Sequence, residues 1–197
     1  LKPDIIVNTG DTAHTKLNLS PSYFDMTAKM FKNLADIAPY HVILGNHDLN
    51  LRNLSRIDAI TPIVEALGHP NLFLHKNTAQ VDVGQDCVLN VLSIIDPENW
   101  TPPEDESKIN IALYHGCVSG VSTDAGFVLS HGDISLSELL GYDYVLLGDI
   151  HKTNQKVDKK GKMRYPGSLI QQNFGETPDK GFLLWDIKDK DDFTVEH

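Results

Sequence analysis

Four short apolar runs in this chain each lead into a glycine with a potential metal ligand beside it. Each run has the length and character of a buried strand. Because ligands gather beyond the carboxyl ends of strands in open α/β sheets, we expect these polar residues to meet at one edge of a sheet. The four run ends are Gly10-Asp11, Gly45-Asn46-His47-Asp48, Tyr114-His115-Gly116 and Gly148-Asp149-Ile150-His151.

The residue types at these ends favour one group of metals. Carboxylate and amide oxygens together with imidazole nitrogens suit manganese, iron or zinc better than calcium. A thiolate site is not expected, because Cys87 and Cys117 lack a paired spacing, and we interpret both as reduced thiols of an intracellular protein. Each motif alone is also typical of a polar turn after a strand, so the prediction depends on the combination.

Length and charge limit the classes of function. A chain of 197 residues suits one domain with its own core. The net charge of −10 argues against a broad electrostatic grip on nucleic acid. A phosphodiester substrate is still compatible, because bound divalent cations reverse the local charge of an acidic cleft. No apolar run approaches the roughly 20 residues that cross a bilayer, and no secretory leader opens the sequence, so we expect neither membrane insertion nor secretion.

Hydrophobic periodicity predicts a layered α/β domain. Ser20 and Pro21 are typical of a helix start and Pro39 of a stop, so we expect a helix between them. A second helix is predicted over Ile57–Leu67. Strands are predicted over Asp4–Asn8, His41–Leu44, Asn71–His75, Ala79–Val83, Val88–Ile94, Ile109–Tyr114, Tyr144–Leu147 and Phe182–Ile187, with a hairpin of Gln155–Val157 and Met163–Tyr165 and a short helix near Ser135–Leu140. Loops are predicted over Thr12–Leu19, Asp96–Lys108 and Val118–His131, and a solvated charge run over Lys188–Asp192.

In this order, the four motifs resemble the signature of the calcineurin-like metallophosphoesterases, which contains Gly-Asp, Gly-Asn-His-Asp/Glu, His-Gly and Gly-His-x-His. Two later segments, Tyr165-Pro166-Gly167-Ser168 and Asn173-Phe174-Gly175-Glu176, are similar to the SbcD branch, the nuclease subunits of double-strand-break repair complexes. The resemblance runs from about Pro3 to about Ile187. It implies a layered α/β/β/α sandwich of two packed mixed sheets flanked by helices, forming a single domain over residues 1–197.

The resemblance also implies a role for each motif residue. The implied metal ligands are Asp11, Asn46, His115, Asp149 and His151. Asp11 would bridge two ions, His151 would bind one of them, and the remaining three ligands would bind the other. His47 would donate a proton to the leaving oxygen, and Asp48 would help to hold its loop. The implied cofactor is a pair of manganese ions, with magnesium, iron or zinc as alternatives.

Two departures from the family pattern affect these roles. Position 149 is Asp where the family usually has His, and since a carboxylate still binds manganese or magnesium we expect an altered metal preference. The family's first motif, Asp-x-His, would precede Leu1, so we interpret the sequence as an N-terminally truncated fragment without a capping domain. We expect one metal at partial occupancy or none, and weak or no activity of the fragment.

The resemblance implies metal-dependent hydrolysis of DNA phosphodiester bonds, with an SbcC-type ATPase as partner and a homodimer in the full-length protein. Two other interpretations stay open. The chain could be a phosphoesterase acting on small nucleotides or phosphoproteins, or a non-catalytic module that binds DNA ends or an ATPase through a degenerate site. The retained His47 favours catalysis, because a residue that is not a ligand would serve little purpose in a scaffold.

Overall fold

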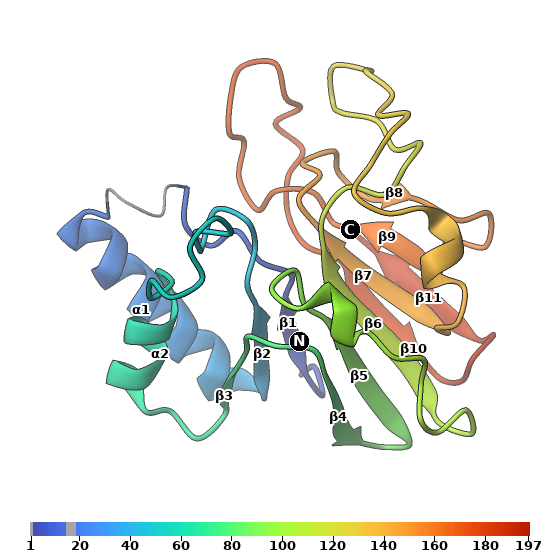
Figure 1. Ribbon diagram of the computed structural model, residues 1–197, viewed down its shortest axis with the longest axis horizontal. Helices are drawn as coiled ribbons and strands as arrows, with labels where there is room; N and C mark the ends of the chain where they lie inside the picture. Colours follow the sequence, from blue (N-terminus) through green and yellow to red (C-terminus); the bar gives the residue numbers. More distant parts are fainter. Residues whose placement is uncertain (1, 15–18) are drawn as a thin grey trace.

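The structure is a computed structural model that describes residues 2–14 and 19–197. Two sheets pack face to face, and the α-helices lie on the outer side of the smaller sheet (Figure 1). The layers run from helices, through a three-stranded and a six-stranded sheet, to an outer cover of loops and a 3-10 turn. The predicted α/β class with two packed sheets is confirmed. Residues 15–18 of the predicted loop Thr12–Leu19 lie outside the described residues.

The smaller sheet is parallel and contains β1 (Ile6–Asn8), β2 (Tyr40–Ile43) and β3 (Leu72–His75). Helices α1 (Pro21–Ile37) and α2 (Thr61–Leu67) pack their apolar side chains against one face of it. The core of this layer contains Phe31, Ala35, Tyr40, Val42, Ile60 and Ile63. None of the described helices has both the length and the apolar character needed to cross a membrane.

Side-chain hydrogen bonds to backbone amides occur at the starts of both helices. The Ser20 hydroxyl accepts a hydrogen bond from the Tyr23 amide at 3.1 Å, which confirms the predicted start of α1. The sequence predicts a second helix from Ile57, whereas α2 begins only at Thr61. The Asp58 carboxylate accepts the amides of residues 60 and 61 at 2.9 and 2.6 Å and so holds the chain in a bend before the helix.

The larger sheet has the strand order β4-β5-β6-β7-β9-β8. Its strands are β4 (Ala79–Gly84), β5 (Cys87–Leu92), β6 (Ile109–His115), β7 (Tyr144–Gly148), β8 (Gln155–Lys156) and β9 (Met163–Tyr165). The central strands β5, β6, β7 and β9 are parallel, and β4 and β8 are antiparallel to their neighbours. The predicted hairpin of β8 and β9 is confirmed.

Apolar side chains fill both sides of the larger sheet. Between the sheets, Ile43 of β2 packs with Leu89, Val91 and Leu113 of the larger sheet. On the outer side, the 3-10 helix η2 (Leu136–Leu139) covers a core containing Tyr114, Val145 and Leu147. The sequence predicts a short helix at this position, and the structure shows one 3-10 turn that begins with a capping box formed by Ser135 and Glu138.

The end of the chain forms a hairpin of β10 (Leu184–Ile187) and β11 (Phe193–Glu196). Strand β11 is not predicted from the sequence. The charged segment Lys188–Asp192, predicted as a solvated run, is the turn between the two strands. This turn helps to fasten the hairpin, because Asp189 and Lys190 contact the rest of the domain and Asp192 contacts Asp189.

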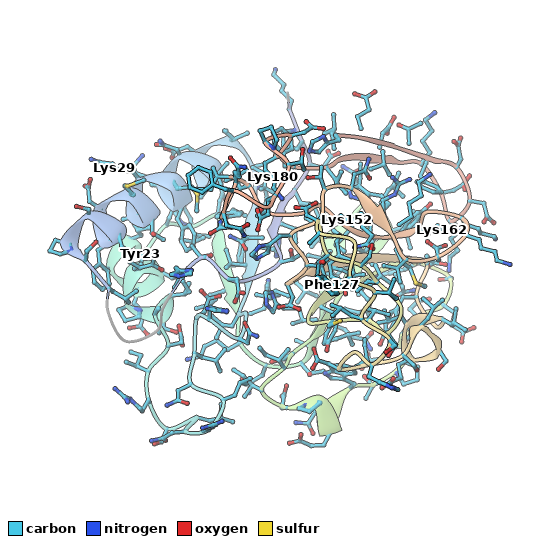
Figure 2. All side chains as sticks on the ribbon, turned by 90° about the horizontal axis from the view of Figure 1, so that it is seen from above. Tyr23, Lys29, Phe127, Lys152, Lys162 and Lys180 are labelled. Carbon is cyan, nitrogen blue, oxygen red and sulfur yellow. The ribbon has the colours of Figure 1, made fainter. Side chains whose placement is uncertain are left out.

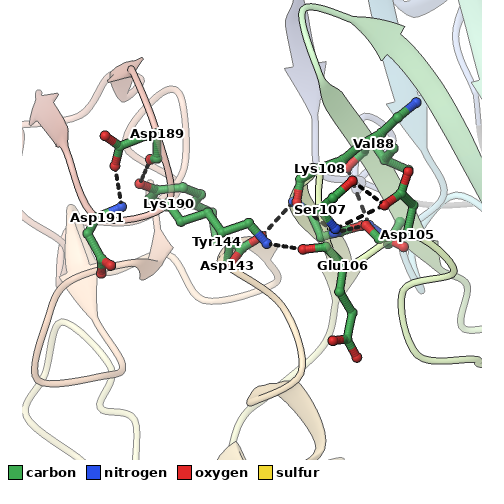
Figure 3. Close-up of polar contacts among 12 residues, drawn as sticks. Val88, Asp105, Glu106, Ser107, Lys108, Asp143, Tyr144, Asp189, Lys190 and Asp191 are labelled. Carbon is green, nitrogen blue, oxygen red and sulfur yellow. Dashed lines mark hydrogen bonds and ion pairs between the residues drawn. The ribbon is translucent and has the colours of Figure 1, made fainter.

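Figure 3 shows how this turn is attached to the larger sheet. The Lys190 ammonium group donates to the Glu106 carbonyl at 2.7 Å and lies 3.1 Å from the Asp143 carboxylate. The Tyr144 hydroxyl donates to the Asp189 carbonyl at 2.6 Å. These contacts lie at the starts of β6 and β7, at the opposite ends of those strands from the predicted ligands.

Candidate metal centre

Three of the predicted ligands meet where the two sheets join. Asp11 lies in the loop that follows β1, His115 is the last residue of β6, and Asp149 follows β7 directly. One ligand atom from each residue lies within 4.8 Å of the other two. Since β1 belongs to the smaller sheet and β6 and β7 to the larger one, the cluster links the two sheets.

The His115 imidazole is held in one orientation. The residue is buried, and its Nδ1 lies 2.7 Å from the Thr9 carbonyl, so Nδ1 is the nitrogen that donates a proton. Nε2 then directs a lone pair toward two carboxylates, at 3.4 Å from Asp11 Oδ2 and 3.8 Å from Asp149 Oδ1. Within the described residues, Nε2 is a buried atom without a hydrogen-bond partner.

The electrostatic field at the cluster favours positive charge. Burial alone would lower the pKa of His115, but the contact with the Asp11 carboxylate and its negative charge outweigh this effect, so the pKa is raised. Burial would raise the pKa of Asp11, and contact with His115 outweighs it in the lowering direction. Burial raises the pKa of Asp149, and His115 only partly offsets this.

Close backbone packing fixes the positions of these groups. A Cβ atom on Gly148 would lie 2.0 Å from the Thr9 carbonyl oxygen and 2.7 Å from His115 Nδ1, so only glycine fits there. Asp11 and Asp149 have φ angles of 56° and 95°, in a region that residues with a side chain rarely adopt. Such backbone strain persists only where the surrounding structure imposes it, and it concentrates at functional sites.

The buried carboxylate of Asp48 connects the loop after β2 to the loop after β1. Its Oδ2 accepts the amides of Asp11 and Gly45 at 2.8 and 2.9 Å, and its Oδ1 accepts the amide of Ala13 at 2.8 Å. Burial raises the pKa of Asp48 to about 6, against the lowering effect of these amides. Asp48 therefore holds both loops of the candidate site in place.

His47 lies on the exposed side of the same loop. Its amide donates to Asp11 Oδ1 at 2.8 Å, so the backbone of His47 orients the Asp11 carboxylate. Its Nδ1 is 2.7 Å from the His14 carbonyl, and the two imidazole rings stack with centroids 6.0 Å apart. Since Nδ1 donates to this carbonyl, Nε2 is the nitrogen that a reacting group could reach.

His151 is not one of the three clustered groups. Asn46 is half-buried in the loop after β2. The His151 side chain is 48% exposed, and its Nδ1 lies 2.9 Å from Glu176 Oε1. Together with Asp149, His151 lines a cavity of about 320 Å³ beside the cluster. The structure thus brings three predicted ligands together and places a fourth on the adjoining cavity.

The clustered residues fit a divalent cation. Two ligand atoms that are each about 2.1 Å from one ion lie about 3 to 3.5 Å apart, close to the two separations measured from His115 Nε2. A buried nitrogen that faces two carboxylates without a hydrogen bond costs free energy unless a cation satisfies it. Asp11, His115 and Asp149 could therefore hold one metal ion.

Comparison with known proteins shows the family to which this chain belongs. A family model described as calcineurin-like phosphoesterase matches residues 1–153. The chain belongs to the calcineurin-like phosphoesterase family. The matched segment contains all four motifs and the three clustered groups. Metal-dependent phosphoester hydrolysis is the activity of this family, and the cluster supplies a candidate site for the ion.

Two viral proteins are similar to this calcineurin-like chain. "Uncharacterized protein R555" of Acanthamoeba polyphaga mimivirus is 38% identical over 204 residues, which cover 98% of this chain and 15% of that protein. "Putative phosphoesterase 244L" of Invertebrate iridescent virus 6 is 27% identical over 199 residues, which cover 92% of this chain and 63% of that protein. The chain therefore spans less than two thirds of the length of either relative.

These comparisons confirm the predicted superfamily and leave the SbcD branch, the DNA substrate and the choice of manganese as proposals. Two residues that shape the site, Thr9 and Glu176, are not predicted from the sequence to have a role in it. Thr9 acts through its backbone carbonyl, which no motif reveals. Glu176 contacts His151, which lies 25 residues earlier in the chain. The segment Asn173–Glu176 indicates only the resemblance to the SbcD branch.

Proposed function

We propose that this calcineurin-like phosphoesterase hydrolyses phosphodiester bonds of DNA, as an SbcD-type nuclease with manganese as its expected ion. The observation that supports this most is the cluster of Asp11, His115 and Asp149 with the exposed His47 imidazole on the adjoining loop. The similarity of the two segments Tyr165–Ser168 and Asn173–Glu176 to the SbcD branch supports DNA as the substrate class.

Each residue would contribute one part of the reaction. Bound divalent ions supply charge stabilisation for the phosphoryl oxygens and lower the pKa of a water molecule. The residues proposed to hold them are Asp11, Asn46, His115, Asp149 and His151. His47 gives a proton from Nε2 to the leaving oxygen, while its Nδ1 stays on the His14 carbonyl. Asp48 keeps the loops of Asp11 and His47 together.

The acidic character of the chain determines how DNA would bind. With a net charge of −10, the protein repels a polyanion except where bound cations reverse the charge. We therefore expect DNA to bind only when the divalent ion is present. We further propose that residues 1–197 act as one domain, that the full-length protein is an intracellular homodimer, and that an SbcC-type ATPase is its partner.

The test is a nuclease assay on the full-length natural protein with manganese, using double-stranded DNA and the small diester bis(p-nitrophenyl) phosphate. The expected result is cleavage of DNA, no cleavage in the presence of a chelator, and a loss of about 10²–10⁴-fold in His47→Ala. His47 is not among the proposed ligands, so the variant should bind manganese as the wild type does.

Two outcomes would replace the proposal with an alternative. Cleavage of the small diester without cleavage of DNA would indicate a phosphoesterase for small nucleotides or phosphoproteins. If wild type and His47→Ala bind DNA equally and neither cleaves either substrate, the chain is a non-catalytic module that binds DNA ends or an ATPase.

A further inference from the structure

Two loops enclose the cavity beside the metal cluster. Residues 119–131 follow β6, and residues 168–180 follow β9; both rise above the carboxyl ends of the strands (Figure 1). The cavity between them is lined by Asp124 from the first loop, by Glu176 from the second, and by Asp149 and His151 from the chain after β7. Any group that enters this cavity therefore meets His151 and its surroundings.

Glu176 is an unusually well-fixed carboxylate for a surface loop. Its side chain is only 7% exposed. Besides His151 Nδ1 at 2.9 Å, it accepts the Gln172 amide at 3.0 Å and the Asn173 side-chain amide at 2.9 Å. These contacts use both carboxylate oxygens, so Glu176 is an acceptor with a fixed position.

Lys180 holds Glu176 in place from the other side. Its side chain, labelled in Figure 2, is 3% exposed. Its Nζ lies 3.2 Å from Glu176 Oε2. The same Nζ donates to Asp124 Oδ2 at 2.8 Å and to the His151 carbonyl at 2.7 Å. A buried ammonium group is stable only when it is paired in this way. Lys180 therefore joins both loops to the backbone of His151.

The histidines around the site share one arrangement. His115 and His47 donate from Nδ1 to backbone carbonyls, and each is left with Nε2 as the nitrogen for a ligand or substrate. His151 also uses Nδ1, but its acceptor is the carboxylate of Glu176. A carboxylate acceptor fixes the tautomer and makes the free nitrogen a stronger ligand than a carbonyl acceptor does.

We propose that Glu176 is a positioning residue that holds His151 in the Nδ1-protonated form, with Nε2 ready to bind a divalent cation, and that Lys180 fixes Glu176 in this role. The proposal rests on the proposed function only in assigning the cation to a hydrolytic site. It adds to the five proposed ligands two residues that touch neither the substrate nor the metal.

The first test reads the imidazole itself in the metal-free protein. Long-range ¹H–¹⁵N NMR at mildly alkaline pH reports which ring nitrogen of His151 carries the proton, with the signal assigned by its loss in His151→Gln. We expect the Nδ1-protonated form in the wild type and loss of that preference in Glu176→Ala. Glu65→Gln, which removes a carboxylate from the exposed side of α2, is the matched control and should leave the tautomer unchanged.

The second test measures manganese binding by calorimetry. Glu176→Ala should weaken binding by about 10–100-fold, the usual contribution of a residue that orients a metal-binding imidazole. Glu176→Gln keeps an acceptor of the same size without its charge and should restore part of the affinity. Lys180→Met should weaken binding in the same direction as Glu176→Ala, because it releases the carboxylate. Circular dichroism shows whether each variant is folded. If Glu176→Ala is unfolded, the manganese affinity of Glu176→Gln is the test of the proposal.

An unchanged tautomer and unchanged manganese affinity in a folded Glu176 variant would overturn the inference, whatever the nuclease assay shows. Conversely, a wild type that fails to hydrolyse any phosphodiester overturns the proposed function, while the tautomer and affinity measurements still decide the role of Glu176. The two failures are therefore distinguishable.

Discussion

Two buried histidines on the two sheets of this protein have opposite surroundings. His115 at the end of β6 and His41 in β2 are both almost fully buried, with 2% and 4% exposed. His115 Nε2 faces the carboxylates of Asp11 and Asp149, which raise its pKa. His41 Nδ1 lies 2.9 Å from His75 Nε2, and burial lowers its pKa to about 4.

The difference shows what distinguishes a candidate ligand from a core histidine. Burial and a bonded Nδ1 are common to both residues, so neither property identifies a site. The carboxylates of Asp11 and Asp149 do identify the site, because they create an electrostatic field that favours a cation. The ring of His41 instead stacks on Phe73 and His75, a surrounding that favours the neutral imidazole.

Replacing each histidine in turn tests whether its surroundings determine metal binding. His115→Ala should lower manganese affinity by at least about 100-fold, since residues that merely orient a ligand already contribute about 10–100-fold. His41→Gln should leave the affinity unchanged, because His41 faces no carboxylate of the cluster. Titration calorimetry of both variants provides the measurement. An equal loss in the two variants would mean that affinity follows core packing and not the cluster.

A second substitution tests the packing that orients His115. Gly148→Ala places a Cβ atom 2.0 Å from the Thr9 carbonyl and 2.7 Å from His115 Nδ1, so it should lower the free energy of unfolding by about 3 kcal/mol. Gly141→Ala is the matched control, because its Cβ would meet no atom within 4 Å. It should change stability by less than about 0.5 kcal/mol in urea denaturation. Similar changes in stability for the two variants would show that the contact of Gly148 with Thr9 and His115 tolerates a side chain.

His41 should make the stability of the protein depend on pH. Its pKa is about 4 in the folded protein and about 6.5 in the unfolded chain, so on acidification the unfolded chain binds a proton first. The stability contribution is complete above pH about 6.5 and is lost as the pH falls toward about 4; it amounts to at most about 3 kcal/mol. His41→Gln should flatten the dependence of the unfolding free energy on pH across this range. An unchanged slope would assign the acid sensitivity to other groups.

Much of the site could be predicted because its signals are local. Each clustered residue lies next to the strand end and glycine that position it, so the short motifs around Asp11, His115 and Asp149 contain their own context. The contact between His151 and Glu176 has no such signal. It depends on how a loop of irregular structure folds back onto the chain after β7, and no period or cap predicts that path.

The fold was predictable to a similar degree. The start of α1 follows from Ser20 and Pro21, which act within one turn. The start of α2 was misplaced, because Asp58 binds the amides that a longer helix would have used. Strand β11 was missed because its four residues follow a dense charge run, and pairing with β10 rather than composition makes them a strand.

Asp11 lies in the loop after β1, whereas His115 and Asp149 lie much later in the chain. During translation, Asp11 therefore emerges before the two residues with which it forms the cluster. The three groups can bind a cation together only after β7 has been made and has docked beside β6. A prematurely terminated product that ends before Asp149 would therefore lack the complete cluster.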